Sequence, residues 1–162
     1  QVTAAPVDGL SVGAAYYTTS GQADGTYQKE ESGDAYIKYT MGNITVAYSE
    51  TRSAPAIAAA SKYATTNHYL YENASYGIQF DVNDALSVSY NLDESEQNTR
   101  SAVAVGASAG TKAVVAMEQE TLQLAYTIGG ATVGLFHVDT DNSDFVTGQN
   151  ETKTVASISM EF

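Results

Sequence analysis

Two histidines and one acidic segment are the residues of this chain whose types and spacing could support chemistry. His137 stands near Asp139 and Ser143, which are the residue types of a hydrolase triad, whereas His68 lies far away in sequence. A triad needs a buried, hydrogen-bonded arrangement that a loop tip seldom holds, and His137 falls at the loop end of a predicted strand. We therefore expect His137 at a surface or rim, and we expect no catalytic residue and no enzyme activity.

The acidic segment, Asp139–Asp144, alternates oxygen ligands like the start of a calcium-binding loop. Such a loop needs glycine at its sixth position and glutamate at its twelfth, where this chain has Asp144 and Asn150. The sequence therefore predicts no specific metal site and no cofactor. An alternative is that acidic loops hold divalent cations loosely and bridge anionic lipid headgroups.

The composition limits the class of protein. The 162 residues carry 19 Asp and Glu against 7 Lys and Arg, a net charge of −12, so we expect no nucleic-acid partner. Cysteine is absent, which excludes disulfide scaffolds and thiol nucleophiles. No apolar run reaches the ~18 to 20 residues of a membrane-spanning helix. Because the chain begins at Gln1 with no signal core, we expect it to follow a cleaved signal or a removed upstream part.

A repeat organises the chain. The segments 39–43, 80–84 and 126–130 each read aromatic, polar, apolar and then a turn pair, and each is followed by residues of alternating polarity. Long polar segments separate these hairpins at 19–33, 53–68, 93–112 and 139–151. We predict one domain, 1–162, folded as an all-β, antiparallel, up-and-down sheet of about eight strands. The predicted strands are 7–18, 34–41, 44–52, 69–82, 86–92, 113–128, 131–138 and 152–162.

Alternation gives these strands two unlike faces. We call them the apolar face and the polar face. Large members of the apolar face are Leu10, Val12, Ile37, Tyr39, Ile44, Val46, Tyr76, Ile78, Phe80, Val88, Tyr90, Leu122, Leu124, Tyr126, Ile158 and Met160. The polar face carries Lys38, Thr40, Thr45, Ser49, Asn73, Ser75, Gln79, Ser87, Ser89, Asn91, Thr121, Gln123, Thr127, Ser157 and Ser159.

The aromatic residues indicate which face meets which solvent. Tyr39, Phe80 and Tyr126 each stand two residues before a turn pair, and Phe162 ends the last strand at a similar level. A ring of aromatics at one height on an apolar face is typical of a lipid interface. The pattern therefore favours a transmembrane barrel, with a soluble β-domain as the alternative.

The repeat, the alternation of short turns with long loops and the ending Ile158-Ser159-Met160-Glu161-Phe162 resemble the C-terminal half of a general porin from the outer membrane of a Gram-negative bacterium. In that family a terminal Phe, with apolar residues two and four places before it, is the signal that the outer-membrane assembly machinery recognises. The resemblance gives this role to Phe162, Met160 and Ile158, and it implies a homotrimer in contact with outer-membrane lipids.

The small side chains of the polar face suit a wide, wetted lumen better than the filled interior of an eight-stranded barrel. We therefore predict about half of a barrel of roughly 16 strands, completed by a missing N-terminal half. The expected function is a water-filled channel for passive diffusion of small hydrophilic solutes and ions, lined by the polar-face residues. A narrow structural or adhesive eight-stranded barrel remains the alternative. Acidic residues beside the loops, among them Glu94 and Glu118, form either a solvated rim or a negative channel mouth.

Overall fold

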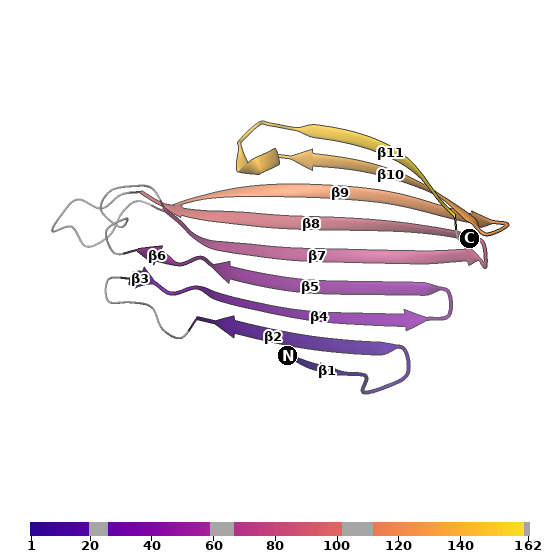
Figure 1. The fold of residues 1–162 in the computed structure, drawn as a ribbon, viewed down its shortest axis with the longest axis horizontal. Helices are drawn as coiled ribbons and strands as arrows, with labels where there is room; N and C mark the ends of the chain where they lie inside the picture. The colour runs from indigo at the N-terminus through magenta and orange to yellow at the C-terminus, as the bar shows by residue number, and fades with distance from the viewer. Residues whose placement is uncertain (20–25, 59–66, 102–111, 161–162) are drawn as a thin grey trace.

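The chain folds as a meander of antiparallel strands, in which tight turns at one end alternate with longer connections at the other (Figure 1). The computed structural model describes residues 1–19, 26–58, 67–101 and 112–160. The elements in these ranges are β1 (Val2–Ala4), β2 (Leu10–Thr18), β3 (Thr26–Gln28), β4 (Glu31–Met41), β5 (Ile44–Ala54), β6 (Ile57–Ala58), β7 (Asn67–Asn83), β8 (Leu86–Arg100), β9 (Lys112–Ile128), β10 (Ala131–Asp141), the 3-10 turn η1 (Ser143–Phe145) and β11 (Glu151–Met160).

Nine strands form one sheet in the order β1-β2-β4-β5-β7-β8-β9-β10-β11, and every neighbouring pair is antiparallel. The predicted all-β, up-and-down architecture is therefore confirmed. The strand that the sequence does not indicate is β1, which places Val2 opposite Ala14 and is too short to show an alternating pattern. The short strands β3 and β6 pair separately, in a second sheet.

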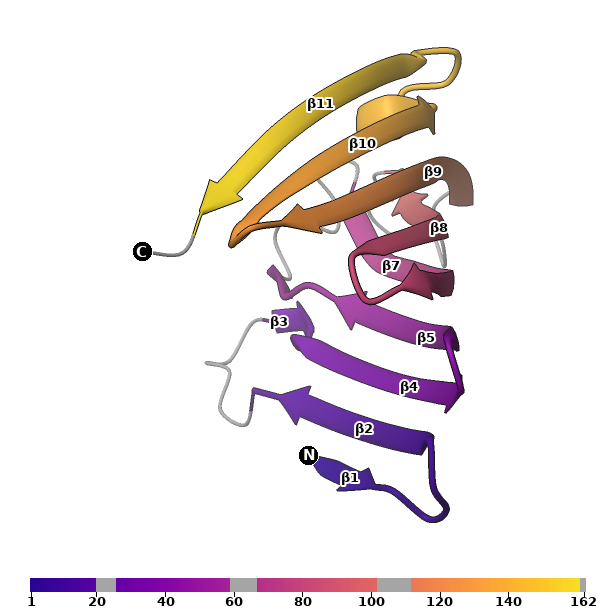
Figure 2. The ribbon, with the colours of Figure 1, turned by 90° about the vertical axis from the view of Figure 1, so that its right-hand side faces the viewer.

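The nine-stranded sheet is curved and open. Figure 2 shows its edge strands, β1 and β11, standing apart from each other. Within the described residues, β1 pairs only with β2 and β11 only with β10. Each edge strand therefore presents one unpaired side of its backbone, and these nine strands alone do not make a closed barrel.

Two of the predicted hairpin turns lie where the sequence places them. Gly42, Gly129 and Gly130 all have positive φ, the conformation that tight two-residue turns require and that glycine adopts without strain. The third turn is displaced by one residue and lies at 84–85. The reason is that Asn83 ends β7, and its side-chain oxygen accepts hydrogen bonds from the amides of Ala85 and Leu86 at 2.9 and 3.0 Å.

The strands β7, β8 and β9 contain 17, 15 and 17 residues; β7 and β9 agree with the predicted ranges within two residues, whereas β8 runs eight residues past its predicted end at residue 92. The predicted end of β8, residue 92, marks where apolar alternation stops, but backbone pairing needs no apolar side chain and continues to Arg100. At ~3.3 Å per residue, β7 is roughly 55 Å long. Since about 9 to 11 tilted residues cross a bilayer, the three strands are long enough to extend well beyond one.

The sheet is a single layer with almost no buried core. Among the described residues, Ile57 is the one buried hydrophobic side chain, and no side chain is less than 2 % exposed. The large side chains of the apolar face are open to their surroundings instead: Ile78 is 49 % exposed and Leu124 is 38 % exposed. In the described part of the chain, no helix is long and apolar enough to cross a membrane.

A contact between a glycine and an aromatic ring helps to fix the pairing of β2 with β4. Gly13 faces Tyr36 across the pair, and a Cβ atom added at Gly13 would lie 2.4 Å from the Tyr36 Cε1 atom. The Tyr36 ring thus lies flat over the glycine, an arrangement that covers backbone and fixes register.

We expect Gly13→Ala to displace this ring and to destabilise the folded protein by about 1–3 kcal/mol, the usual cost of overpacking. The measurement is the free energy of unfolding in urea. Gly33→Ala, on β4, is the matched control, because the nearest atoms to its added Cβ lie at 3.6 and 3.7 Å, in ordinary van der Waals contact. Equal stability of the two variants would contradict a stabilising contact between the Tyr36 ring and Gly13.

Candidate functional site

The polar face is the candidate site, since the register brings its predicted residues onto one side of the sheet. All fifteen predicted wall residues share this face. One row crosses five strands: Thr40 of β4, Thr45 of β5, Gln79 of β7, Ser89 of β8 and Gln123 of β9. Hydroxyls and amides therefore form a continuous row across the sheet on this face.

These side chains bond to one another in the plane of the wall. The hydroxyls of Thr40 and Thr45 are 3.0 Å apart, and those of Thr127 and Thr132 are 2.9 Å apart. The Ser75 hydroxyl donates to the Asp93 carboxylate, across the pair of β7 and β8. Each of these hydroxyl oxygens keeps a lone pair that can accept a hydrogen bond from water, so the side chains can be hydrated while they bond to one another.

The polar face is the concave face of the curved sheet. Small side chains on it are crowded, with Thr121 at 7 % and Thr140 at 8 % exposure, while the larger Leu122 on the other face is 52 % exposed. Side chains converge on the inner surface of a curved layer and diverge on its outer surface. The apolar face is therefore convex, and the polar face lines the hollow of the sheet. Figure 2 shows the curvature itself.

The aromatics of the apolar face are staggered in a regular way. Followed across β5, the pairing of Tyr39 leads to Ile78 of β7, which lies two residues before Phe80. Followed across β8, the pairing of Phe80 leads to Leu124 of β9, which lies two residues before Tyr126. Each step of two strands thus shifts the aromatic by two residues toward the tight turns.

This stagger of one residue per strand defines a tilt. With ~3.3 Å per residue and ~4.8 Å between strands, the aromatics come level when the strands tilt by about 35°. Strands of transmembrane barrels tilt by roughly 35–45°. The three aromatics therefore form one level belt only in a barrel-like orientation, which the sequence alone does not reveal. Phe162 lies outside the described residues.

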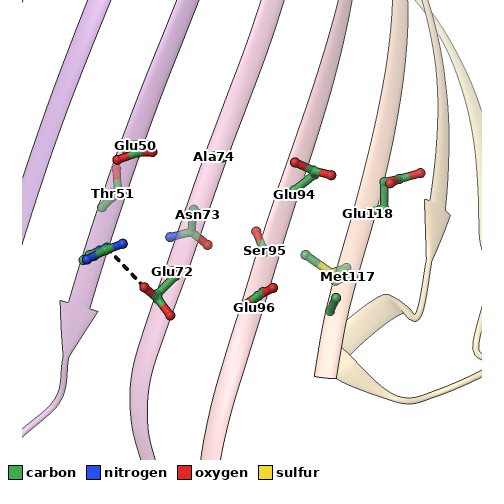
Figure 3. Close-up of a pocket in the computed structure, with 12 residues that line it drawn as sticks. Glu50, Thr51, Glu72, Asn73, Ala74, Glu94, Ser95, Glu96, Met117 and Glu118 are labelled. Carbon is green, nitrogen blue, oxygen red and sulfur yellow. Dashed lines mark ion pairs between the residues drawn. The ribbon is translucent and has the colours of Figure 1, made fainter. Parts of the chain in front are cut away.

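Carboxylates end the apolar face at the long-loop side. Figure 3 shows Glu50, Glu72, Glu94, Glu96 and Glu118 lying across β5, β7, β8 and β9. The Arg52 Nε atom pairs with the Glu72 Oε1 atom at 3.1 Å. By register these glutamates continue the apolar face, so Glu94 and Glu118 do not face the hollow of the sheet. They mark the level where the convex surface changes from apolar to charged.

Few charges lie on the polar face between the tight turns and the level of these carboxylates. Lys38 lies there, opposite Ser11 and Ala47, and forms no ion pair with another described residue. Asp81 and Asp93 share this face, and Asp81 accepts a hydrogen bond from the Gln79 amide at 2.8 Å. Lys38 is therefore a free positive charge on the concave wall.

The positions of several aromatic side chains on the concave face were not predicted from the sequence. Tyr36 covers Gly13, and Phe136 lies against Gly134, where an added Cβ would be 2.9 Å from the Phe136 ring. Tyr71 also belongs to this face, and its ring contacts that of Phe145, with centroids 6.0 Å apart. Tyr71 lies within the predicted strand 69–82, where alternation from Asn73 places it on the polar face, but no local pattern indicates the position of Phe145.

The residues first considered for catalysis are not assembled into a triad. His137 lies on the convex face, with its Nδ1 atom 2.8 Å from the Thr154 hydroxyl and its Nε2 atom 3.3 Å from the Asp139 carboxylate. Both ring nitrogens are thus engaged away from Ser143, whose amide bonds to the Gln149 carbonyl at 2.6 Å.

The acidic segment after β10 is likewise dispersed. The Asp139 carboxylate accepts a hydrogen bond from the Thr152 hydroxyl at 2.6 Å, and Asn142 uses its side chain to fix the loop backbone. No group of three or more His, Asp or Glu side chains is placed to hold a metal ion in the part of the chain that the structure describes.

The predicted assembly residues lie on the last strand. Ile158 and Met160 are on the apolar face of β11 and are 65 % and 54 % exposed. They are accessible beside the unpaired edge of the sheet, as a recognition signal would need to be. Comparison of the chain with protein-family models, curated proteins and solved structures finds no match. Function must therefore be derived from this arrangement of side chains.

Proposed function

We propose that this chain forms part of the wall of a porin, a water-filled channel in the outer membrane of a Gram-negative bacterium, through which small hydrophilic solutes and ions diffuse passively. The observation that carries the proposal is the sidedness of a single-layer sheet. Its convex face exposes large apolar side chains over many strands, and hydroxyls and amides predominate on its concave face. Apolar patches beyond a few hundred Å² are rare on soluble monomers and mark contact with a membrane or a partner.

A soluble β-domain is the weaker reading, because such a domain buries its large apolar side chains in a close-packed core. Among the described residues, Ile57 is the only hydrophobic side chain that is buried. The level aromatic belt and the carboxylates above it also match the limits of an apolar band, which in transmembrane barrels is about 25 Å tall.

A complete eight-stranded barrel is disfavoured by the strand β1. Closing the eight longer strands on themselves would pair β11 with the free edge of β2, but β1 already occupies that edge at Val12–Ala14. With β1 included there are nine strands, and the two edge strands run in the same direction. An antiparallel barrel then needs an odd number of further strands. Seven strands from a missing N-terminal half would give the roughly 16 of the proposed barrel.

The proposed partners follow from this geometry and from the porin resemblance. The lipid-facing residues are those of the apolar face, with Tyr39, Phe80, Tyr126 and Phe162 at the interface. Ile158, Met160 and Phe162 form the signal for the assembly machinery. We propose a homotrimer, as the resemblance implies.

Planar-bilayer recording of the full-length protein tests the proposal. We expect stepwise conductance that persists in symmetric salt, and a detergent-dependent protein whose gel mobility changes on boiling. A folded, detergent-dependent protein without conductance would favour the structural barrel. A protein that stays folded in buffer without detergent would favour the soluble domain.

Lys38 is expected to bias the channel against cations. An ion roughly 10 Å from a unit charge in water interacts with it by about 0.4 kcal/mol. Lys38→Glu reverses one charge, so it lowers the energy of a cation and raises that of an anion by about 0.8 kcal/mol each, and together these changes correspond to a roughly 15-fold rise in the cation-to-anion permeability ratio. The measurement is the reversal potential in a salt gradient.

The effect of Lys38→Glu should shrink at high salt because screening shortens the range of the charge. Glu50→Lys is the control, since it is a charge reversal of equal size on the convex face. A permeability ratio that responds to Glu50→Lys and not to Lys38→Glu would place the conducting path on the other side of the sheet.

A further inference from the structure

The connection between β10 and β11, residues 142–150, is ordered by its own hydrogen bonds. The Asn142 side chain donates to the Ala116 carbonyl of β9 at 2.9 Å and accepts from the Gly148 amide at 2.8 Å. The Ser143 amide bonds to the Gln149 carbonyl at 2.6 Å, and the Val146 amide bonds to the Ser143 carbonyl at 3.1 Å. These bonds tie the segment to itself and to the neighbouring strand.

This segment reaches across the concave face. Tyr71 lies on that face of β7, where its hydroxyl accepts a hydrogen bond from the Gln97 amide of β8 at 3.3 Å. The Phe145 ring meets the Tyr71 ring edge-on, with centroids 6.0 Å apart and planes at 61°. The strands β8 and β9 separate β7 from β10, a span of about 14 Å. Phe145 can contact Tyr71 only by lying over the concave side of these strands.

The backbone is held in an unfavourable conformation to make this contact. Asn142, Asp144 and Phe145 have φ values of 51°, 56° and 59°, in the left-handed region, which Asn and Asp tolerate but which is unfavourable for a bulky residue such as Phe145. Strain of this kind persists only where surrounding contacts determine it, and it is concentrated at functional sites. The hydrogen bonds of Asn142 and the ring contact of Phe145 provide those contacts here.

We propose that residues 142–150 form a fixed inward lip that narrows the long-loop mouth of the channel and sets the largest solute that enters, with the hydrogen bonds of Asn142 holding it on β9 and Phe145 on Tyr71 as its contact with β7. This assignment rests on the proposed channel function. It gives the lip a definite position, over β8 and β9 at the end of β10, and makes Phe145 a residue that determines size selectivity.

The test compares single-channel conductance and the size limit for neutral sugars in liposome swelling, using the full-length protein. We expect Phe145→Ala to raise conductance on the order of 1.5-fold to twofold and to admit larger sugars, because the pore dimension at the mouth increases. Phe145→Tyr should keep wild-type values, since it preserves the edge-on ring contact. Val146→Ala is the control, because this neighbouring side chain is 49 % exposed.

A second readout does not depend on conduction. The chain has no cysteine, so Tyr71→Cys together with Phe145→Cys can be linked by a short bis-maleimide in the assembled protein, whereas Tyr71→Cys with Val146→Cys should link far less. Absence of the first link, or wild-type conductance in Phe145→Ala with boiling-sensitive mobility retained, would overturn the lip. Absence of conductance in the wild type would instead defeat the channel, and the link would still report the inward position of Phe145.

Discussion

Arginine in place of Leu124 is expected to prevent assembly into the membrane, whereas arginine in place of the adjacent Gln123 is expected to be tolerated. Leu124 lies on the apolar face between Val88 and Leu135, within the band that begins at Ile128 and ends before Glu120. Arginine at the midplane of a bilayer costs about 2–4 kcal/mol in a transmembrane barrel. Gln123 lies on the concave face, where in the proposed channel water would surround the new charge.

The measurements are the amount of protein in the outer-membrane fraction and the free energy of unfolding in lipid vesicles. Leu124→Arg should lower the unfolding free energy by about 2–4 kcal/mol, and Gln123→Arg should change it little. Since a charge placed in a soluble core would also destabilise, a third variant separates the two readings. Ile128→Arg lies beside the turn at Gly129, where the bilayer cost falls to about 0–1 kcal/mol.

A membrane therefore predicts a graded series, with Leu124→Arg severe and Ile128→Arg mild. Equal and large losses for both variants would contradict lipid as the surrounding of the apolar face. Equal losses for Leu124→Arg and Gln123→Arg would contradict the sidedness itself.

The fold was predictable where the signal is local. Side chains alternate with a period of two along a strand, so apolar and polar residues reveal both the strand and its face without any knowledge of its partners. Turn pairs such as Gly42-Asn43 fix which strands are neighbours, because a two-residue connection leaves no other choice. From these signals follow the up-and-down order and the common face of residues as distant as Lys38 and Ser159.

The features that escaped prediction depend on contacts between distant segments or on backbone pairing without an apolar signal. Phe145 contacts Tyr71 across two intervening strands, and its left-handed backbone has no marker such as glycine in the sequence. The strand β8 continues to Arg100 through polar residues on both faces, so its end is invisible to a hydropathy pattern. For the same reason the sequence leaves Glu94 in a loop and Glu118 beside one, where either a rim or a channel mouth fits them, and the register assigns both to the convex face.

Cysteine labelling along β9 is expected to show a period of two within the apolar band. The natural chain contains no cysteine, so each single substitution is the sole reactive thiol. Gln123→Cys and Ala125→Cys lie on the concave face and should react with a water-soluble, charged maleimide about tenfold or more faster than Leu122→Cys and Leu124→Cys. The physical reason is that the thiolate is the reactive species, and an apolar surrounding suppresses its formation.

Beyond the band the alternation should disappear, and the position where it disappears measures the height of the band. Ala116 and Glu118 belong to the convex face but lie among carboxylates, whereas Met117 lies on the concave face. If both faces meet water at this level, Ala116→Cys and Met117→Cys should label at similar rates. A period of two that continued through Ala116 would extend the lipid contact past Glu120 and Glu118. Uniform labelling from 122 to 125 would show water on both sides of the sheet, which a lipid-facing convex surface does not permit.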